Sequence, residues 1–239
     1  GRSSDDGWVT LFNGKDLDDW TVKIAGYEVN ENPGNIFRVK NGMLAVSYDN
    51  FDKFDGQYGH IFYKEKFSHY ILRLDYRFIG EQLTGGAGWA FRNSGVMIHS
   101  QSPESMRVDQ DFPVSIEVQI LGGNGVDPRP TGNLCTPGTN VVIDGKLVTD
   151  HCINSSSKTY HGDQWVRLEV EVHGNEVIHH IINGEVVMEY NQPQLDETDR
   201  DAKELLKTTD KMLSEGYICL QAESHPCEFK NIQIKLLEE

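Results

Sequence analysis

The sequence predicts an all-β protein, a sandwich or barrel of short antiparallel strands with one helical segment. Apolar residues occupy every even position of residues 70–78 and alternate with polar residues throughout 166–173, which is the period of a strand that buries one face. Dipeptides typical of two-residue hairpin turns separate such segments: Asn41-Gly42, Asp144-Gly145 and Asn183-Gly184. Asn, Asp and Gly tolerate the positive φ angles that these turns require.

The expected strands, in chain order, are residues 36–39, 43–48, 59–63, 69–79, 95–100, 114–121, 140–143, 165–173, 176–182, 185–190, 216–222 and 227–236. The helical segment is 199–207, with Thr198 as its expected N-cap. Segments 101–113 and 122–139 are rich in Pro, Gly, Asp and Asn and border strong strands, so we expect them to be ordered loops that shape a pocket. Because no Pro/Ser linker divides the chain, one domain is expected over residues 7–238.

Composition excludes several classes of partner. The chain has 239 residues, 37 acidic against 22 basic, and a formal net charge of −15. Such an acidic surface repels phosphate backbones and anionic membranes, so nucleic acid is not an expected partner, although the charge also simply promotes solubility. No apolar run of about 18 residues predicts a membrane-spanning segment.

The cysteine count and the start of the chain bear on localisation. Two disulfides among Cys135, Cys152, Cys219 and Cys227 allow three connectivities, of which nearest-neighbour pairing, 135–152 and 219–227, suits two closed loops. Disulfides would place the protein in an oxidising compartment, whereas buried free thiols are the alternative. Residues 1–6 are polar and begin with Gly, so we expect a tag remnant or flexible end, in a secreted or periplasmic protein whose export signal, or that of a surface lipoprotein, was removed.

Strand parity selects the first candidate site residues. In residues 114–121, Ile116, Val118 and Ile120 share one face, so Glu117 and Gln119 project together from the other. A carboxylate beside an amide suits sugar hydroxyls, and the carboxylate can also transfer a proton. The competing interpretation is an ordinary solvated strand face.

Neighbouring segments extend this polar face. Arg92 and Asn93 lie in the turn that leads into strand 95–100, where His99 is expected opposite the core. The end of strand 216–222 carries Gln221, Glu223 and His225 at alternate positions. A His beside a Glu is typical of an acid/base pair or part of a metal site, although a single His is more often structural. Aromatic platforms for a sugar could come from Trp89, Trp165, Tyr58 and Tyr160, which a sandwich core could equally use.

Several motifs in family order resemble the 3-keto-disaccharide hydrolase family, formerly a domain of unknown function in the concanavalin A-like lectin/glucanase superfamily. The resemblance rests on Trp8-Val9-Thr10-Leu11-Phe12-Asn13-Gly14-Lys15-Asp16-Leu17-Asp18-Asp19-Trp20, Asn93-Ser94-Gly95-Val96, Glu117-Val118-Gln119-Ile120, Val142-Ile143-Asp144-Gly145-Lys146, Trp165-Val166-Arg167-Leu168-Glu169, Gly216-Tyr217-Ile218-Cys219-Leu220-Gln221 and Glu228-Phe229-Lys230-Asn231-Ile232. It spans about residues 8–236 and implies a jelly roll of two antiparallel sheets, carbohydrate as partner, and a bacterial periplasmic or secreted protein.

Two departures from related patterns are informative. The family commonly ends the late strand with a Gln-Asp-His-Gly-like motif, whereas residues 221–226 here read Gln-Ala-Glu-Ser-His-Pro. Laminarinase-type sandwich glycosidases carry Glu-x-Asp-x-x-Glu on one strand, whereas this chain has Glu117 and Gln119 with no second Glu there. The usual carboxylate pair of a glycosidase is therefore absent from that strand.

The resemblance implies a hydrolytic route that needs no such pair. A ketone at sugar C3 acidifies the C2 proton, so one base can remove it, the C1 substituent can leave, and water can add back. The hypothesis assigns Glu117 or His225 as base and Glu223 as acid or metal ligand. Hydroxyl-binding groups are then Arg92, Asn93, His99, Gln119, Gln221 and Trp89. A divalent metal ion on the enolate is compatible but has no ligand spacing in its favour, and a non-catalytic, lectin-like module is the alternative function.

Overall fold

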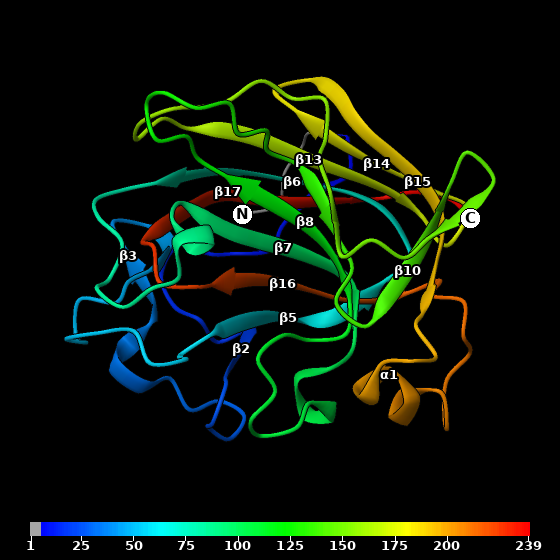
Figure 1. Cartoon of the computed structure of the whole chain (residues 1–239), viewed down its shortest axis with the longest axis horizontal. Coiled ribbons are helices and arrows are strands. Elements are labelled where there is room, and N and C mark those ends of the chain that lie inside the picture. The colour runs from blue at the N-terminus through cyan, green and yellow to red at the C-terminus, as the bar shows by residue number, and fades with distance from the viewer. Residues whose placement is uncertain (1–5) are drawn as a thin grey trace.

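The larger of two β-sheets contains ten antiparallel strands in the computed structural model, which describes residues 6–239. Their spatial order is β11 (Lys146–Val148), β10 (Thr139–Ile143), β15 (Glu185–Leu195), β14 (Val177–Ile182), β13 (Val166–His173), β6 (His69–Phe78), β17 (Cys227–Leu236), β4 (Met43–Val46) and β3 (Phe37–Lys40), with β1 (Trp8–Thr10) paired to β17. Figure 1 shows the middle strands of this sheet, β6 and β17, behind the second sheet.

The second sheet contains seven antiparallel strands. They run in the order β12 (Cys152–Ile153), β9 (Asn133–Cys135), β8 (Ile116–Leu121), β7 (Asn93–Ser100), β16 (Gly216–Ala222), β5 (Gly59–Phe67) and β2 (Trp20–Ile24). Short 3₁₀ turns, η1 (Pro33–Asn35), η2 (Gly88–Ala90) and η3 (Pro103–Ser105), and one helix, α1 (Arg200–Leu205), lie in the connections. The two layers form the predicted jelly-roll sandwich, and the predicted fold class is confirmed.

The core lies between the two sheets. Alternate residues of β6 and β13 are buried, as their sequence alternation predicts. On β8, Ile116, Val118 and Ile120 have no exposed surface and belong to the same apolar cluster. This burial leaves the other face of β8 for Glu117 and Gln119, because successive side chains of a strand point to opposite faces.

Alternation and turn dipeptides in the sequence predict the ends of most strands to within a few residues. The three hairpin dipeptides have positive φ at both residues, as primed turns require. Five strands lie outside the ranges expected from the sequence: β1, β2, β9, β11 and β12. Most of these strands are three residues or shorter, and β9 lies within the segment expected to be a loop, so their pairing partners and not their own patterns define them.

The structure tests the predicted start of the helix but not the prediction for the start of the chain. Thr198 is not the helix N-cap: the Asp199 side chain accepts hydrogen bonds from the amides of Asp201 and Ala202, so α1 begins one residue later than expected. The predicted tag remnant or flexible end covers residues 1–6, of which only Asp6 is among the described residues. No helix in the described part of the chain is long and apolar enough to cross a membrane.

One of the two nearest-neighbour disulfides is present. Cys135 on β9 and Cys152 on β12 are bonded, with their Cα atoms 4.1 Å apart. The pairing of Cys219 with Cys227 is wrong, because both are buried free thiols. Cys219 packs with Phe62 and Met97 on the outer face of the seven-stranded sheet, whereas Cys227 lies in the core between the sheets, so the two thiols point into different layers.

Reduction of the Cys135–Cys152 bond should destabilise the protein. The bond joins residues 17 positions apart, and closing a loop of that length is worth about 3 kcal/mol through restriction of the unfolded chain. We expect a fall in Tm of about 5–10 °C on adding a reductant, measured by calorimetry. The Cys135→Ser/Cys152→Ser variant should start at the lower Tm and not respond to reductant; an equal response in that variant would contradict the assignment.

Candidate active site

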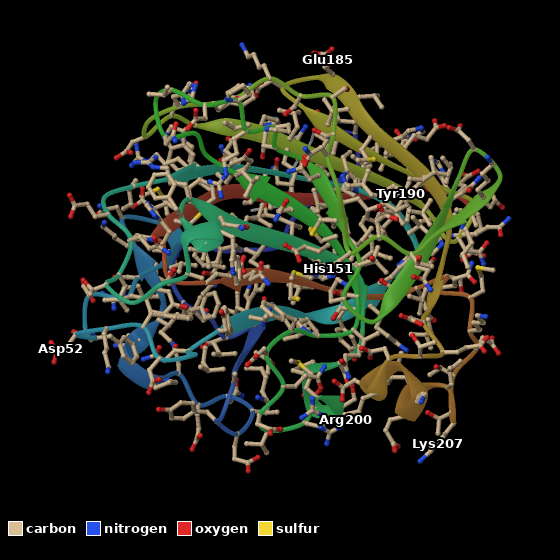
Figure 2. The ribbon with its side chains drawn as sticks, in the orientation of Figure 1. Asp52, His151, Glu185, Tyr190, Arg200 and Lys207 are labelled. Carbon is tan, nitrogen blue, oxygen red and sulfur yellow. A yellow bond between two sulfur atoms is a disulfide. The ribbon has the colours of Figure 1, made fainter. Side chains whose placement is uncertain are left out.

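A pocket opens on the outer face of the seven-stranded sheet. Its volume is about 450 Å³, and its polar floor comes from Glu117 and Gln119 of β8, Asn93 of β7, and Glu223, which directly follows β16. The walls come mainly from connecting segments: Trp89, Phe112, Leu121, Arg129, Cys135, Pro137, His151 and Cys152. Both loop segments, 101–113 and 122–139, contribute to the pocket, as the sequence predicts. Figure 2 labels His151 over this sheet.

Strand register aligns polar side chains across the sheet beneath this pocket. The aligned positions are Lys23 on β2, His60 on β5, Gln221 on β16, Gly95 on β7, Gln119 on β8 and Asn133 on β9. Adjacent members make hydrogen bonds: the Asn133 amide donates to Gln119 Oε1 over 3.1 Å. Register therefore builds a polar row, interrupted at Gly95, from residues distant in sequence.

Gln221 links the two acidic residues of the pocket. Its carboxamide nitrogen lies 2.5 Å from Glu223 Oε1 and 3.3 Å from Glu117 Oε2, while its oxygen accepts a hydrogen bond from His60 Nε2 over 3.1 Å. This orientation follows from chemistry, since an amide oxygen facing two carboxyl groups would meet mainly acceptors. Two carboxyl oxygens that share one nitrogen lie closer than the about 6.5–9.5 Å typical of inverting glycosidases.

Gly95 allows this close approach. A Cβ at position 95 would lie 2.6 Å from Glu117 Oε2 and 2.8 Å from a terminal carboxamide atom of Gln221. Any side chain would thus displace both groups. The glycine of the Asn93-Ser94-Gly95-Val96 motif forms the floor over which the side chains of β8 and β16 meet.

Burial raises the proton affinity of both acids. Glu117 is 8% exposed and Glu223 is 4% exposed. Desolvation raises the pKa of Glu117 to about 8. Desolvation, followed by the proximity of Glu117, raises the pKa of Glu223 well above its usual range, partly offset by Arg129. The pair therefore retains a proton near neutral pH and can supply an acid and a base together.

Arg129 places a fixed positive charge beside this pair. Its guanidinium donates to the carbonyl oxygens of Phe91, Gly122 (2.8 Å) and Trp89 (3.1 Å). These backbone acceptors carry no formal charge, so the positive charge remains available to the carboxyl of Glu223 or to a bound anion. Arg129 is not among the residues expected from the sequence, because it lies in the Pro- and Gly-rich segment 122–139, which has no periodic pattern.

Asn93 and Trp89 lie at the pocket as expected. Asn93 donates through Nδ2 to the Trp89 carbonyl over 2.8 Å, and its buried Oδ1 has no hydrogen-bond partner among residues 6–239. Trp89 is 53% exposed and lies parallel to Tyr58, with ring centroids 6.2 Å apart. Tyr160 instead packs in the core, and the cations of Arg77 and Lys230 lie over the ring of Trp165, at 4.6 Å and 4.0 Å from its centroid.

The structure does not bring His225 or Arg92 into the pocket. His225 is buried edge-on against Phe78 at 5.9 Å and Phe91 at 5.3 Å, because Ser224 adopts a φ of 108° and ends the alternation of β16. Arg92 pairs with Asp163 over 2.6 Å and also donates to the Gly162 carbonyl. Its own φ of 41° turns it away from Asn93, its neighbour in the chain.

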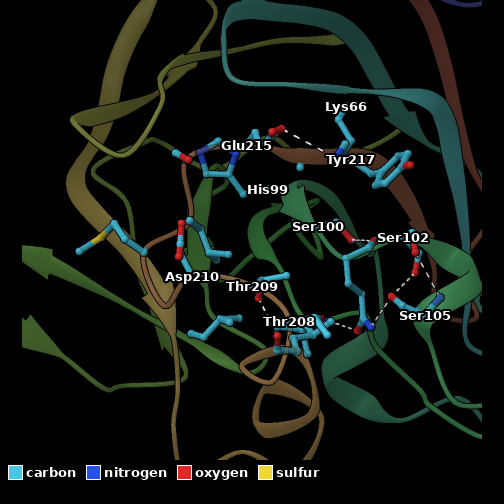
Figure 3. A pocket seen from close by; sticks show the side chains of 18 residues that line it. Lys66, His99, Ser100, Ser102, Ser105, Thr208, Thr209, Asp210, Glu215 and Tyr217 are labelled. Carbon is cyan, nitrogen blue, oxygen red and sulfur yellow. Dashed lines mark hydrogen bonds and ion pairs between the residues drawn. The ribbon is translucent and has the colours of Figure 1, made fainter.

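His99 lines a different cavity, of about 590 Å³, beside the segment that follows α1 (Figure 3). A φ of 50° interrupts the alternation of β7, and Nε2 lies 2.8 Å from the carbonyl oxygen of Gly174, in the turn between β13 and β14. Strand parity therefore fails at both histidines for the same reason, a residue with positive φ at the end of a strand.

His60 and His151 are further site residues that the sequence analysis missed. His60 lies within the expected strand 59–63, but its place beside Gln221 depends on the pairing of β5 with β16. His151 is exposed at the pocket wall next to the disulfide. A signal for His60 existed in its position on a predicted strand, but no local feature indicates which strand lies beside it.

The pocket is a poor fit for the divalent ion considered from the sequence. Within residues 6–239, no group of three or more His, Cys, Asp and Glu side chains is placed to hold a metal ion. Glu117 and Glu223 are joined through the Gln221 amide nitrogen, a donor that a cation would have to displace.

A jelly roll with an acidic pocket on one sheet defines a glycosyl hydrolase-like or carbohydrate-binding fold. The chain belongs to the family described as the 3-keto-alpha-glucoside-1,2-lyase-like domain, which matches residues 7–235. The family recognised from the sequence motifs is thus confirmed. No curated protein matches the chain significantly.

Several solved structures share the fold. Two are candidate glycosyl hydrolases from Parabacteroides distasonis: one has a TM-score of 0.58 at 18% identity, covering 100% of this chain and 99% of that one. The other has a TM-score of 0.56 at 20% identity, covering 96% and 99%. A galectin-like protein of unknown function from Bacillus subtilis has a TM-score of 0.58 at 13% identity, covering 96% and 94%. At these identities the likeness shows the fold alone.

The buried acids should make stability depend on pH in a specific direction. A carboxyl whose pKa is raised to about 8 by folding binds a proton in the native state that the unfolded chain has already lost, so its contribution to the free energy of unfolding falls from about pH 5 to about pH 8. Glu117→Gln removes this titration, and its Tm should exceed that of the wild type by a few degrees above pH 8. Calorimetry across pH tests this.

The matched control is Glu185→Gln, at an exposed hairpin position of β15. Its Tm should track that of the wild type at every pH. A Glu117→Gln curve parallel to the wild-type curve would show that Glu117 titrates normally and is not held protonated by burial.

Proposed function

We propose that the protein cleaves 3-keto glycosides by elimination across C1–C2, followed by hydration. The observation that carries this proposal is the pair of buried carboxyl groups, Glu117 and Glu223, that meet at the Gln221 amide nitrogen. The family description, a 1,2-lyase acting on 3-keto-alpha-glucosides, supports the same chemistry. Acid and base lie on one side of a pocket large enough for one sugar ring and part of its substituent.

In the elimination step, ionised Glu117 removes the proton from C2, which the C3 ketone acidifies. The C2–H electron pair is delocalised onto the C3 oxygen as an enolate. When the ketone re-forms, C1 and C2 become doubly bonded and the C1–O bond breaks. Protonated Glu223 donates its proton to the departing oxygen, while the Arg129 charge and the Asn93 and Gln119 amides stabilise and orient the substrate oxygens.

Hydration returns both groups to their starting states. Glu223, now ionised, removes a proton from water as the water oxygen bonds to C1, and Glu117 returns its proton to C2. The net reaction is hydrolysis of the glycosidic bond. Elimination without the hydration step would instead release the unsaturated keto sugar. The apolar wall formed by Trp89, Phe112 and Leu121 provides a surface for the sugar face or the leaving group.

The burial of Glu117 and Glu223 supports a catalytic role over carbohydrate binding alone. A lectin-like face needs aromatic platforms and amides, and Trp89 and Gln119 would satisfy that requirement. It has no use for two desolvated acids, which burial makes unfavourable to ionise. We therefore place the non-catalytic carbohydrate-binding module second.

The disulfide supports one further part of the proposal. The Cys135–Cys152 bond lines the pocket beside Glu117, the residue paired with Cys135 in the sheet. Persistent disulfides form in oxidising compartments, so we propose export to the periplasm or cell exterior.

Substrate oxidation state should decide turnover. A 3-keto-glucoside should be consumed with transient absorbance of a conjugated enone, and the matching plain glucoside should not react, since its C2 proton is not acidic. Reaction can be followed by ultraviolet absorbance and by release of the leaving group. Equal turnover of the two substrates would reject elimination in favour of ordinary glycosidase chemistry.

Glu117→Gln should lower kcat for the 3-keto-glucoside by about 10²–10⁴-fold, because it removes the base. In the wild type, kcat/KM should rise with pH up to about 8 as Glu117 ionises. Ligand affinity, measured by calorimetry with the plain glucoside, should change little. A variant that keeps full turnover would assign the base elsewhere, and a wild type that binds sugar without turnover would favour the lectin-like alternative.

A further inference from the structure

His60 is a buried imidazole that the elimination scheme does not use. It lies on β5, 1% exposed, one strand beyond Gln221. Phe62 and Phe112 cover it, with ring centroids 6.5 Å and 6.1 Å from the imidazole. Its Nε2 lies 3.1 Å from the Gln221 carboxamide, so the buried ring has a polar partner.

The hydrogen bond to Gln221 defines the tautomer of His60. Gln221 turns its carboxamide oxygen toward His60 Nε2 at 3.1 Å, so that nitrogen must carry the proton. Burial, and then the charge of Lys23, lower the pKa of His60 to about 3, so the ring stays neutral over the working pH range. Its donor to Gln221 is therefore constant while the two acids titrate.

Lys23 supports this arrangement from the far side. Its side chain is 2% exposed, and Nζ donates to the carbonyl oxygens of Ile24 over 3.0 Å and Val108 over 2.9 Å. Of the charged groups, Lys23 faces His60 from β2, and Glu117 and Glu223 face it through Gln221 from β8 and from the end of β16. Burial and the Lys23 charge thus favour the neutral ring.

We propose that His60 is a positioning residue of the active site, which acts through Gln221 to hold the carboxamide nitrogen against Glu117 and Glu223. Without the His60 donor, the carboxamide could rotate its oxygen toward a protonated carboxyl and accept from it. The amide would then stabilise the neutral acid instead of the carboxylate. His60 thereby sets the pH at which the pair changes from acid to base. The consequence for catalysis rests on the proposed function, whereas the hydrogen-bond geometry does not.

The test is a ¹³C NMR titration of the glutamate carboxyl carbons in the substrate-free protein, assigned with Glu117→Gln and Glu223→Gln. His60→Phe should raise the midpoint of the first ionisation of the pair by about 1–2 pH units, the value of one hydrogen bond to a charged group. His60→Gln, which restores an N–H donor, should bring the midpoint back toward the wild-type value. The rising limb of kcat/KM should move with the NMR midpoint.

Phe62→Leu is the matched control, a buried residue on the same face of β5 with no hydrogen bond to the pair. It should leave the carboxyl midpoints unchanged. Should His60→Phe fail to fold, Gln221→Met removes the amide itself and should produce the same upward shift. Unchanged midpoints in a folded His60→Phe or Gln221→Met protein, or an equal shift in Phe62→Leu, would overturn the proposal. If the variants show the expected midpoint shifts but the wild-type protein does not turn over the 3-keto-glucoside, the proposed function alone is rejected.

Discussion

The meeting of three side chains over one glycine is the constraint on which the site depends. Glu117 and Gln221 come from strands on either side of β7, and they approach each other only because Gly95 has no Cβ between them. Glu223 completes the group from the end of β16. Two antiparallel pairings therefore assemble groups separated by more than a hundred residues, and the register of each pairing determines which side chains meet.

Such a site opposes stability. Two carboxyl groups, an amide and an imidazole are removed from water on a sheet face that could otherwise carry apolar residues, as Phe62, Met97 and Cys219 do at the next positions of the same strands. Desolvation raises the proton affinity of the acids, and the hydrogen bonds of Gln221 limit the cost by satisfying several polar atoms at once. The core between the sheets supplies the stability that permits this arrangement.

The loops determine how the polar face becomes a pocket. Segment 122–139 contains β9, which carries Cys135, and the disulfide to Cys152 ties a second connection to the pocket wall. Arg129, in the same segment, is held by hydrogen bonds to four backbone carbonyls. The sequence predicted that these loops shape a pocket, but it could not identify the residues that line it, since irregular segments have no period from which to assign a face.

By itself, the sequence determined the all-β fold, the strands with strong alternation, the hairpin turns and the common face of Glu117 and Gln119. Each of these follows from local steric rules, the two-residue period of a strand and the positive φ of a primed turn. Only the tertiary structure decided that His60 and Arg129 belong to the site and that His99 and His225 do not. Pairing register, positive-φ residues at strand ends and the partner of each thiol depend on contacts between distant segments, and no local pattern encodes them.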